Sequence, residues 1–242
     1  MIRNASRKSA LVSAAYARGK SNKHKFSISF LALIIFLFFF DLAVPAEAPL
    51  SPGISQLLLL TRDTVTQKFA AAGDATIDDN RPSSNFGTDQ FLYVGMTSTS
   101  TTCSVLRFDV SGFPADKPIL SAKMKVYVNS CSVCGGSAYL AAYKLTTAWH
   151  ESTVTWQTPW EKYGGDFDAT TVSTTPIMNP DAGTWKDLDI TPWVQAWVAA
   201  PGSNNGVILR VINQTSTQYQ LSSSENAVPA WAPVLTVEYG VP

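Results

Sequence analysis

The chain has 242 residues, of which 45% are hydrophobic, 11% are aromatic and only 15% are charged. This composition excludes an intrinsically disordered chain, and 14 glycines are too few for a collagen-like repeat. The formal net charge is zero, but residues 49–242 carry 11 basic and 16 acidic side chains. A region with this balance has no positive field that would attract DNA or RNA, so nucleic-acid binding is not expected.

Residues 1–48 have the parts of a secretory signal. Seven basic residues lie near an uncharged apolar run, Phe26–Phe40, and small residues follow, with cleavage expected after Ala46 or Ala48. As a helix this run would span about 22 Å, less than the ~30 Å hydrocarbon core of a bilayer. We therefore favour a cleaved signal peptide. The alternative is an uncleaved signal anchor, and only in that case would the chain contact a membrane, through this segment alone. Both interpretations place the rest of the chain in a secreted or extracytoplasmic location.

Residues 49–63 are interpreted as a linker and residues 64–242 as one domain. Strand-like runs, separated by Gly, Pro, Asn and Ser, lie at 90–95, 104–110, 122–128, 138–145, 152–156, 185–190, 206–212, 218–223 and 233–239. Short strands at this spacing predict an all-β fold, a jelly-roll-like β-sandwich of short antiparallel strands. One short helix is predicted, with Thr191 as N-cap, Pro192 in its first position and an end before Pro201.

Period-2 alternation is clear in two of these runs. Apolar residues share one face at Leu106, Phe108 and Val110, and again at Met124, Val126 and Val128. The alternation therefore directs basic and aromatic side chains outward, at Arg107, Lys123, Lys125 and Tyr127. Lys144 and Arg210, in other strands, extend this candidate surface. Such side chains bind carboxylated sugars and stack on pyranose rings; the alternative is that they only keep the sheet soluble.

A second candidate platform lies in a long connection and next to it. Its aromatic residues are Trp160, Tyr163, Phe167 and Trp185. Loops positioned on a rigid scaffold often carry binding residues. The two surfaces are separate hypotheses at this point.

Five segments together resemble the DNRLRE-type domain, also described as carbohydrate-binding module family 96. They are 74–95, 104–114, 148–156, 185–197 and 222–239, with "AWHESTVTW" and "WKDLDITPWVQAW" the most specific. The resemblance implies a β-sandwich of jelly-roll type found outside the cell. Some such modules bind acidic polysaccharides such as alginate.

The residues of these motifs look structural. Large aromatic residues dominate core burial, so we expect Trp149, Trp156 and Trp197 to fill the core. Glu151 and Asp189 are expected to bond backbone groups or a helix end. No ligand-binding residue is transferred from the motifs.

Catalysis has little support in the sequence, and no enzymatic activity is expected. The two histidines, His24 and His150, form no pair within the domain, and no G-x-S-x-G, H-E-x-x-H or P-loop pattern is present. No cofactor is expected, except that a structural calcium site is a weak alternative at Asp74, Asp78 and Asp79. A solvated turn with Asx hydrogen bonds is favoured there.

The three cysteines are Cys103, Cys131 and Cys134. In an exported protein the C-x-x-C pair predicts a small-loop disulfide between Cys131 and Cys134. The alternative pairs Cys103 with one of the other two.

Taken together, these patterns predict an exported, non-catalytic carbohydrate-binding module. Its partner is expected to be a polysaccharide or cell-surface polymer, and an acidic polysaccharide is one candidate. The alternative is a structural or adhesive extracellular surface module without a sugar site.

Overall fold

The computed structural model describes residues 63–133, 138–213 and 216–241. The predicted signal or anchor segment (1–48) and the predicted linker, except Asp63, lie outside the described residues and stay predictions. Within the described ranges, no helix has both the length and the apolar character needed to cross a membrane.

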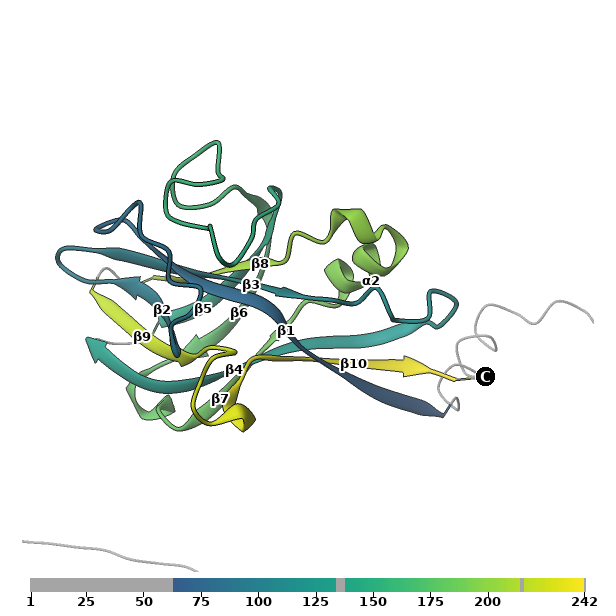
Figure 1. Ribbon diagram of the computed structural model, residues 1–242. Coiled ribbons are helices and arrows are strands. Elements are labelled where there is room, and N and C mark those ends of the chain that lie inside the picture. Colours follow the sequence, from purple (N-terminus) through teal and green to yellow (C-terminus); the bar gives the residue numbers. More distant parts are fainter. Residues whose placement is uncertain (1–62, 134–137, 214–215, 242) are drawn as a thin grey trace, which may run out of the picture. The chain divides into compact units, whose positions relative to one another are not determined.

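Ten strands and one α-helix form the described chain (Figure 1). The strands are β1 (Thr64–Asp78), β2 (Phe91–Met96), β3 (Thr101–Phe108), β4 (Ile119–Val133), β5 (Ala138–Leu145), β6 (Phe167–Ile177), β7 (Thr184–Asp189), β8 (Val207–Ile212), β9 (Thr217–Ser222) and β10 (Val234–Gly240). The helices are α2 (Thr191–Ala199) and the short 3-10 turns η1 (Asn179–Asp181), η2 (Pro201–Ser203) and η3 (Pro229–Trp231). The predicted all-β class with one short α-helix is confirmed.

Six of the strands close a ring, in the order β1, β10, β4, β9, β2, β3 and back to β1. All pairings are antiparallel. Closure depends on β1, whose first half pairs with β10 and whose second half pairs with β3, with a register shift between Ala71 and Gly73. β8, β5 and β6 continue the sheet from β3, and β7 pairs with β4. The fold is a closed antiparallel β-barrel with additional strands, and β1 runs beside β10 in Figure 1.

The strand predictions fail at three places. Residues 152–156 form a turn followed by irregular backbone, because the His150 carbonyl oxygen accepts hydrogen bonds from the Thr153 and Val154 amides and turns the chain. β1 and β6 were not predicted as strands. Their sequences lack a clear apolar alternation, and non-local pairing with β10, β3 and β5 holds them extended.

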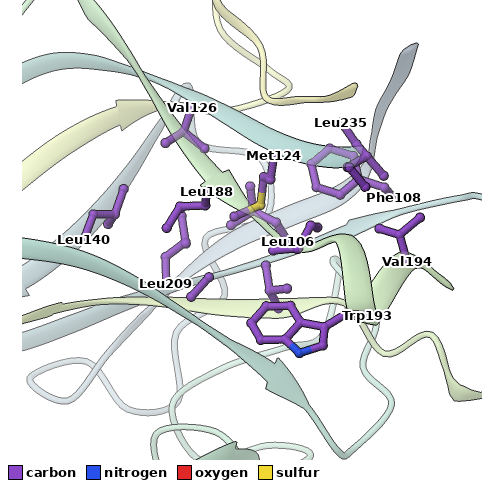
Figure 2. Packing of buried hydrophobic residues seen from close by; sticks show 14 of the residues in the cluster. Leu106, Phe108, Met124, Val126, Leu140, Leu188, Trp193, Val194, Leu209 and Leu235 are labelled. Atoms are coloured by element: carbon purple, nitrogen blue, oxygen red, sulfur yellow. The ribbon is translucent and has the colours of Figure 1, made fainter. Parts of the chain in front are cut away.

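The two predicted apolar faces meet in the main core. Leu106, Phe108, Met124, Val126 and Val128 are fully buried. Figure 2 shows several of these side chains gathered with residues of α2 and β10. The predicted inward faces of β3 and β4 are therefore confirmed.

β3 is buried on both faces, which the alternation did not predict. Cys103 and Val105, on its other side, belong to a second apolar cluster with Trp149, Val154 and Trp160. The segment between β5 and β6 supplies these three side chains and covers that face. This face of β3 is consequently not an open surface for a ligand.

The helix begins one residue earlier than an N-cap at Thr191 requires. Ile190 occupies the N-cap position, Thr191 is the first helical residue, and Pro192 lies in the first turn. Asp189 Oδ1 accepts hydrogen bonds from the Thr191 backbone nitrogen at 3.0 Å and from its hydroxyl at 2.6 Å. These bonds lower the pKa of Asp189, and they confirm its expected role at a helix end.

The predicted core tryptophans are largely confirmed. Trp149 and Trp197 are buried, and Trp156 is partly buried against the second cluster. The Trp149 indole nitrogen donates a hydrogen bond to the Asn205 carbonyl at 2.9 Å. These rings join loops and the helix to the barrel.

Cys103 is a free cysteine buried in β3. Burial raises the pKa of its thiol to about 11, so the reactive thiolate is scarce at neutral pH. The alternative pairing of Cys103 is therefore not found. Cys134 lies outside the described residues, and the Cys131–Cys134 disulfide stays a prediction.

Candidate functional site

A groove of about 620 Å³ lies over β10 and its neighbours, within the size range of small-ligand sites. Its lining comes from β1, β4, β7, β10 and the segment around η3. The lining residues are Lys68, Ala70, Lys125, Trp185, Pro229, Ala230, Ala232, Pro233, Val234 and Thr236. This lining is given for the described ranges of the chain alone.

Strand register places these side chains side by side. Lys68 of β1 lies opposite Thr236 of β10, and Val234 of β10 lies opposite Lys125 of β4. β7 adds the next row, because Tyr127 pairs with Trp185. Alternation along each strand then points these residues away from the buried faces, so four strands share one polar and aromatic outer face.

Three aromatic rings form a cluster at one side of the groove. Tyr127 stacks on Trp231 with ring centroids 4.7 Å apart and planes at 9°. Trp185 meets Tyr127 edge to face, with centroids 5.4 Å apart. Trp185 keeps 37% of its surface exposed, so Tyr127 and Trp231 support it while its indole remains available to a ligand.

The groove has two lysines and, among its described lining residues, no carboxylate. Lys68 is exposed and takes part in none of the ion pairs within the described ranges. Lys125 lies 3.6 Å from the Asp187 carboxylate, and both side chains are well exposed. Such exposed pairs contribute little to stability, so an incoming carboxylate can compete for Lys125. Lys123 lies next to the groove, in a smaller hollow that it shares with Lys125.

The other basic candidates do not line this groove. Arg107 borders a separate hollow with Asp109, and its guanidinium lies 5.8 Å from the ring centroid of Trp149. Arg210 on β8 lies over the Phe167 ring at 5.2 Å. Lys144 is on β5. The predicted basic surface is thus divided, with Lys123, Lys125 and Tyr127 on one face and these residues on other strands.

The second aromatic platform is divided as well. Trp160 is buried, and its indole nitrogen donates a hydrogen bond to the Thr155 carbonyl at 2.8 Å, so it has no free face. Tyr163 is 68% exposed in the segment between β5 and β6. Trp185 joins Tyr127 instead. The two surfaces expected separately are therefore joined at Tyr127 and Trp185.

The predicted metal residues also separate. Asp78 is paired with Arg81 at 2.9 Å and accepts a hydrogen bond from the Asn80 amide, as in an Asx turn. Asp79 accepts one from the Thr101 amide at 2.7 Å. Asp74 lies instead among other carboxylates.

Asp74 belongs to an acidic group that the sequence did not indicate. One oxygen of each carboxylate of Asp74, Glu151 and Glu225 lies within 4.8 Å of the others. Burial, followed by the negative charge of Glu225, raises the pKa of Asp74 to about 7. Glu151 Oε1 accepts a hydrogen bond from the Asp74 amide at 2.7 Å, which confirms that Glu151 bonds a backbone group.

Sequence reasoning missed Lys68 in the groove lining and Trp231, whose ring stacks on Tyr127. Lys68 lies in a strand that was not predicted. Trp231 is partly buried and lies in the proline-flanked stretch "VPAWAP", and an aromatic residue between two prolines was the one signal that pointed to it.

Comparison with known proteins gives one clear result. The chain matches carbohydrate-binding module family 96 over residues 65–239. This range contains the helix and all the described strands, except the first residue of β1 and the last residue of β10. No match is found among curated proteins. Because the match covers most of the chain and includes the strands that build the groove, the chain belongs to carbohydrate-binding module family 96.

Proposed function

We propose that the chain is an exported, non-catalytic module that binds acidic polysaccharide in the groove lined by Lys68, Lys125 and Trp185. Family membership supports carbohydrate as the ligand class and agrees with a binding role without catalysis. The observation that carries the proposal is the junction of an exposed indole with two lysines in a lining without carboxylates. We also propose that the chain is exported and that its ligand is acidic. We further propose that the barrel is, in finer detail, a jelly-roll-like sandwich.

The chemistry of the groove fits a uronic acid polymer. The indole of Trp185 offers an apolar face with a polar edge, which matches a pyranose ring. Lys68 and Lys125 come from β1 and β4, on the two sides of β10, so they can meet carboxylates of different sugar units along a chain. Lysine acts as a flexible point charge, which suits a repetitive polymer better than one fixed geometry.

The test measures binding of the purified full chain to a polyuronate and to a neutral β-glucan by calorimetry. We expect binding to the polyuronate that weakens as salt rises from 50 to 500 mM, about the range over which exposed charges become screened. Lys68→Ala and Lys125→Ala should each weaken it by about tenfold, the lower end for a charge-assisted hydrogen bond. Lys144→Ala, a lysine outside the groove, is the matched control.

Different failures have different meanings. Equal affinity for both polymers, without salt dependence, would contradict the acidic ligand while keeping carbohydrate binding. Absence of binding to any glycan would favour the structural or adhesive surface module. Loss of affinity in Lys144→Ala equal to that in Lys125→Ala would move the site away from the groove.

A further inference from the structure

Three carboxylates from distant parts of the chain meet at one end of the second half of β1. Asp74 lies in β1, Glu151 in the turn after β5, and Glu225 in the turn that follows β9. One oxygen of each lies within 4.8 Å of the other two. None of the ion pairs in the described ranges includes any of the three. Three carboxyl groups thus converge without an ion-pair partner there.

Asp74 provides a second, independent observation. Its side chain is buried, with 1% of the residue exposed. Oδ2 accepts a hydrogen bond from the Ser224 amide at 2.9 Å, whereas Oδ1 is buried and has no hydrogen-bond partner in the described chain. A buried carboxylate oxygen without a partner is costly, because it has lost water and gained nothing in exchange.

The surrounding backbone holds Glu151 in place. Asn85 Nδ2 donates hydrogen bonds to the carbonyl oxygens of Glu151 at 2.6 Å and of Val154 at 2.7 Å. At Gly87 a side chain is excluded, since a Cβ there would lie 2.3 Å from the Glu151 carbonyl oxygen and 2.7 Å from its Cγ. The position of Glu151 is therefore determined by its neighbours.

Glu225 closes the group from the solvent side. It is exposed, and its Oε1 accepts a hydrogen bond from the Ser224 hydroxyl at 2.9 Å. The Glu225 backbone amide donates to the Ser223 hydroxyl at 3.1 Å, which fixes the turn. Asp74 is buried, Glu151 is intermediate and Glu225 is exposed, so the group reaches the solvent, where water can complete a coordination shell.

We propose that Asp74, Glu151 and Glu225 bind a hard divalent cation, with Ca²⁺ the preferred ion. All three ligands are carboxylate oxygens, the donor set of Ca²⁺ and Mg²⁺ and not of softer metals. Calcium binds oxygen at about 2.3–2.6 Å, so ligands on opposite sides are separated by roughly 4.6–5.2 Å. Magnesium, at about 2.0–2.1 Å, needs a tighter octahedron and retains more water. The distances between the three oxygens, all within 4.8 Å, are compatible with the coordination sphere of the larger ion.

A cation bound by these carboxylates would join three segments of the chain that are not paired with one another as strands around the site. It would link the second half of β1 to the turn after β5 and to the turn after β9. The site differs from the one expected from sequence, because Asp78 and Asp79 are occupied by Arg81 and by backbone amides. The expected role is therefore structural stabilisation.

The experiment titrates CaCl₂ into the chelator-treated full chain by calorimetry, up to about 10 mM, because extracellular Ca²⁺ sites have dissociation constants as weak as ~10⁻³ M. We expect one Ca²⁺ per chain and a rise in melting temperature on binding, since a ligand of the native state stabilises it. Glu225→Gln, an exposed change that spares the fold, should weaken Ca²⁺ binding at least tenfold. Asp74→Asn should abolish it, and Glu161→Gln, an exposed glutamate elsewhere, should leave it unchanged.

Two results would overturn the proposal. One is the absence of heat and of any melting shift with either Ca²⁺ or Mg²⁺ at 10 mM, in which case the carboxylates share a proton and no metal. The other is Ca²⁺ binding that Glu225→Gln retains at wild-type strength. Neither readout involves a glycan, so the outcome is independent of the proposed groove.

Discussion

Replacing Trp185 with alanine is expected to weaken polyuronate binding by at least about tenfold while leaving the melting temperature nearly unchanged. Exposed aromatic anchors at the centre of a binding surface commonly contribute the largest single losses on truncation. Trp185 lies on the outer face of β7 and keeps more than a third of its surface exposed, so its removal opens no cavity in the core. Calorimetric titration and thermal unfolding of the same preparation measure both effects.

The matched control for this prediction is Tyr163→Ala. Tyr163 is more exposed than Trp185 and lies in a different segment, between β5 and β6. It should leave both affinity and stability unchanged. If Trp185→Ala binds as tightly as the unaltered chain while Tyr163→Ala does not, the ligand lies on the other loop and the groove is not the site.

Replacing Trp197 with alanine is expected to have the largest effect on stability, a loss of about 3–5 kcal/mol, as for other large-to-small changes in a core. Trp197 of α2 is fully buried, and its indole nitrogen has no hydrogen-bond partner in the described chain. Trp197→Phe should lose much less, because it keeps most of the apolar ring and removes an unpaired donor. Urea unfolding monitored by circular dichroism gives the free energy of unfolding for each variant.

Equal losses for the phenylalanine and alanine variants would contradict this account. They would mean that the indole nitrogen contributes a favourable interaction. Trp185→Ala serves as the control, since loss of a half-exposed ring outside the core should change the free energy of unfolding by less than about 1 kcal/mol.

Local sequence patterns predicted the parts of the fold that depend on local chemistry. Met124 and Val126 alternate with Lys125 and Tyr127, and the structure buries the first pair and leaves the second on the outer face. The ends of α2 were equally legible, because Pro192 lies in its first turn and the helix ends before Pro201 as predicted. Periodicity reports which face of an element is apolar, and that is sufficient for a sheet with one buried side.

Periodicity fails where a distant segment covers the second face. Arg107 was expected on an open surface opposite Leu106 and Phe108. In the structure Val105, on the same side as Arg107, is buried beneath Trp149 and its neighbours. No pattern within β3 shows that the chain between β5 and β6 returns over it, because that contact belongs to the tertiary fold.

The two candidate sites were hidden for the same reason. Tyr127 and Trp185 are 58 positions apart, and only the β4–β7 register brings them together. Asp74 and Glu225 are farther apart still, and their meeting depends on the turn after β9 reaching β1, as the Ser224–Asp74 hydrogen bond shows. Each residue was visible in the sequence, but pairings across such separations were not.

The most direct test of the central claim, that the groove over β10 binds the saccharide, uses the indole N–H signals of the seven tryptophans in a two-dimensional NMR spectrum. Trp185→Phe and Trp231→Phe assign the signals of the groove indole and of the indole stacked on Tyr127, and the buried Trp149, Trp160 and Trp197 act as internal references. On titration with a uronic acid oligosaccharide, we predict saturable shifts of the Trp185 and Trp231 signals while the references stay in place. Saturable binding that leaves both the Trp185 and the Trp231 signals unmoved would contradict the account.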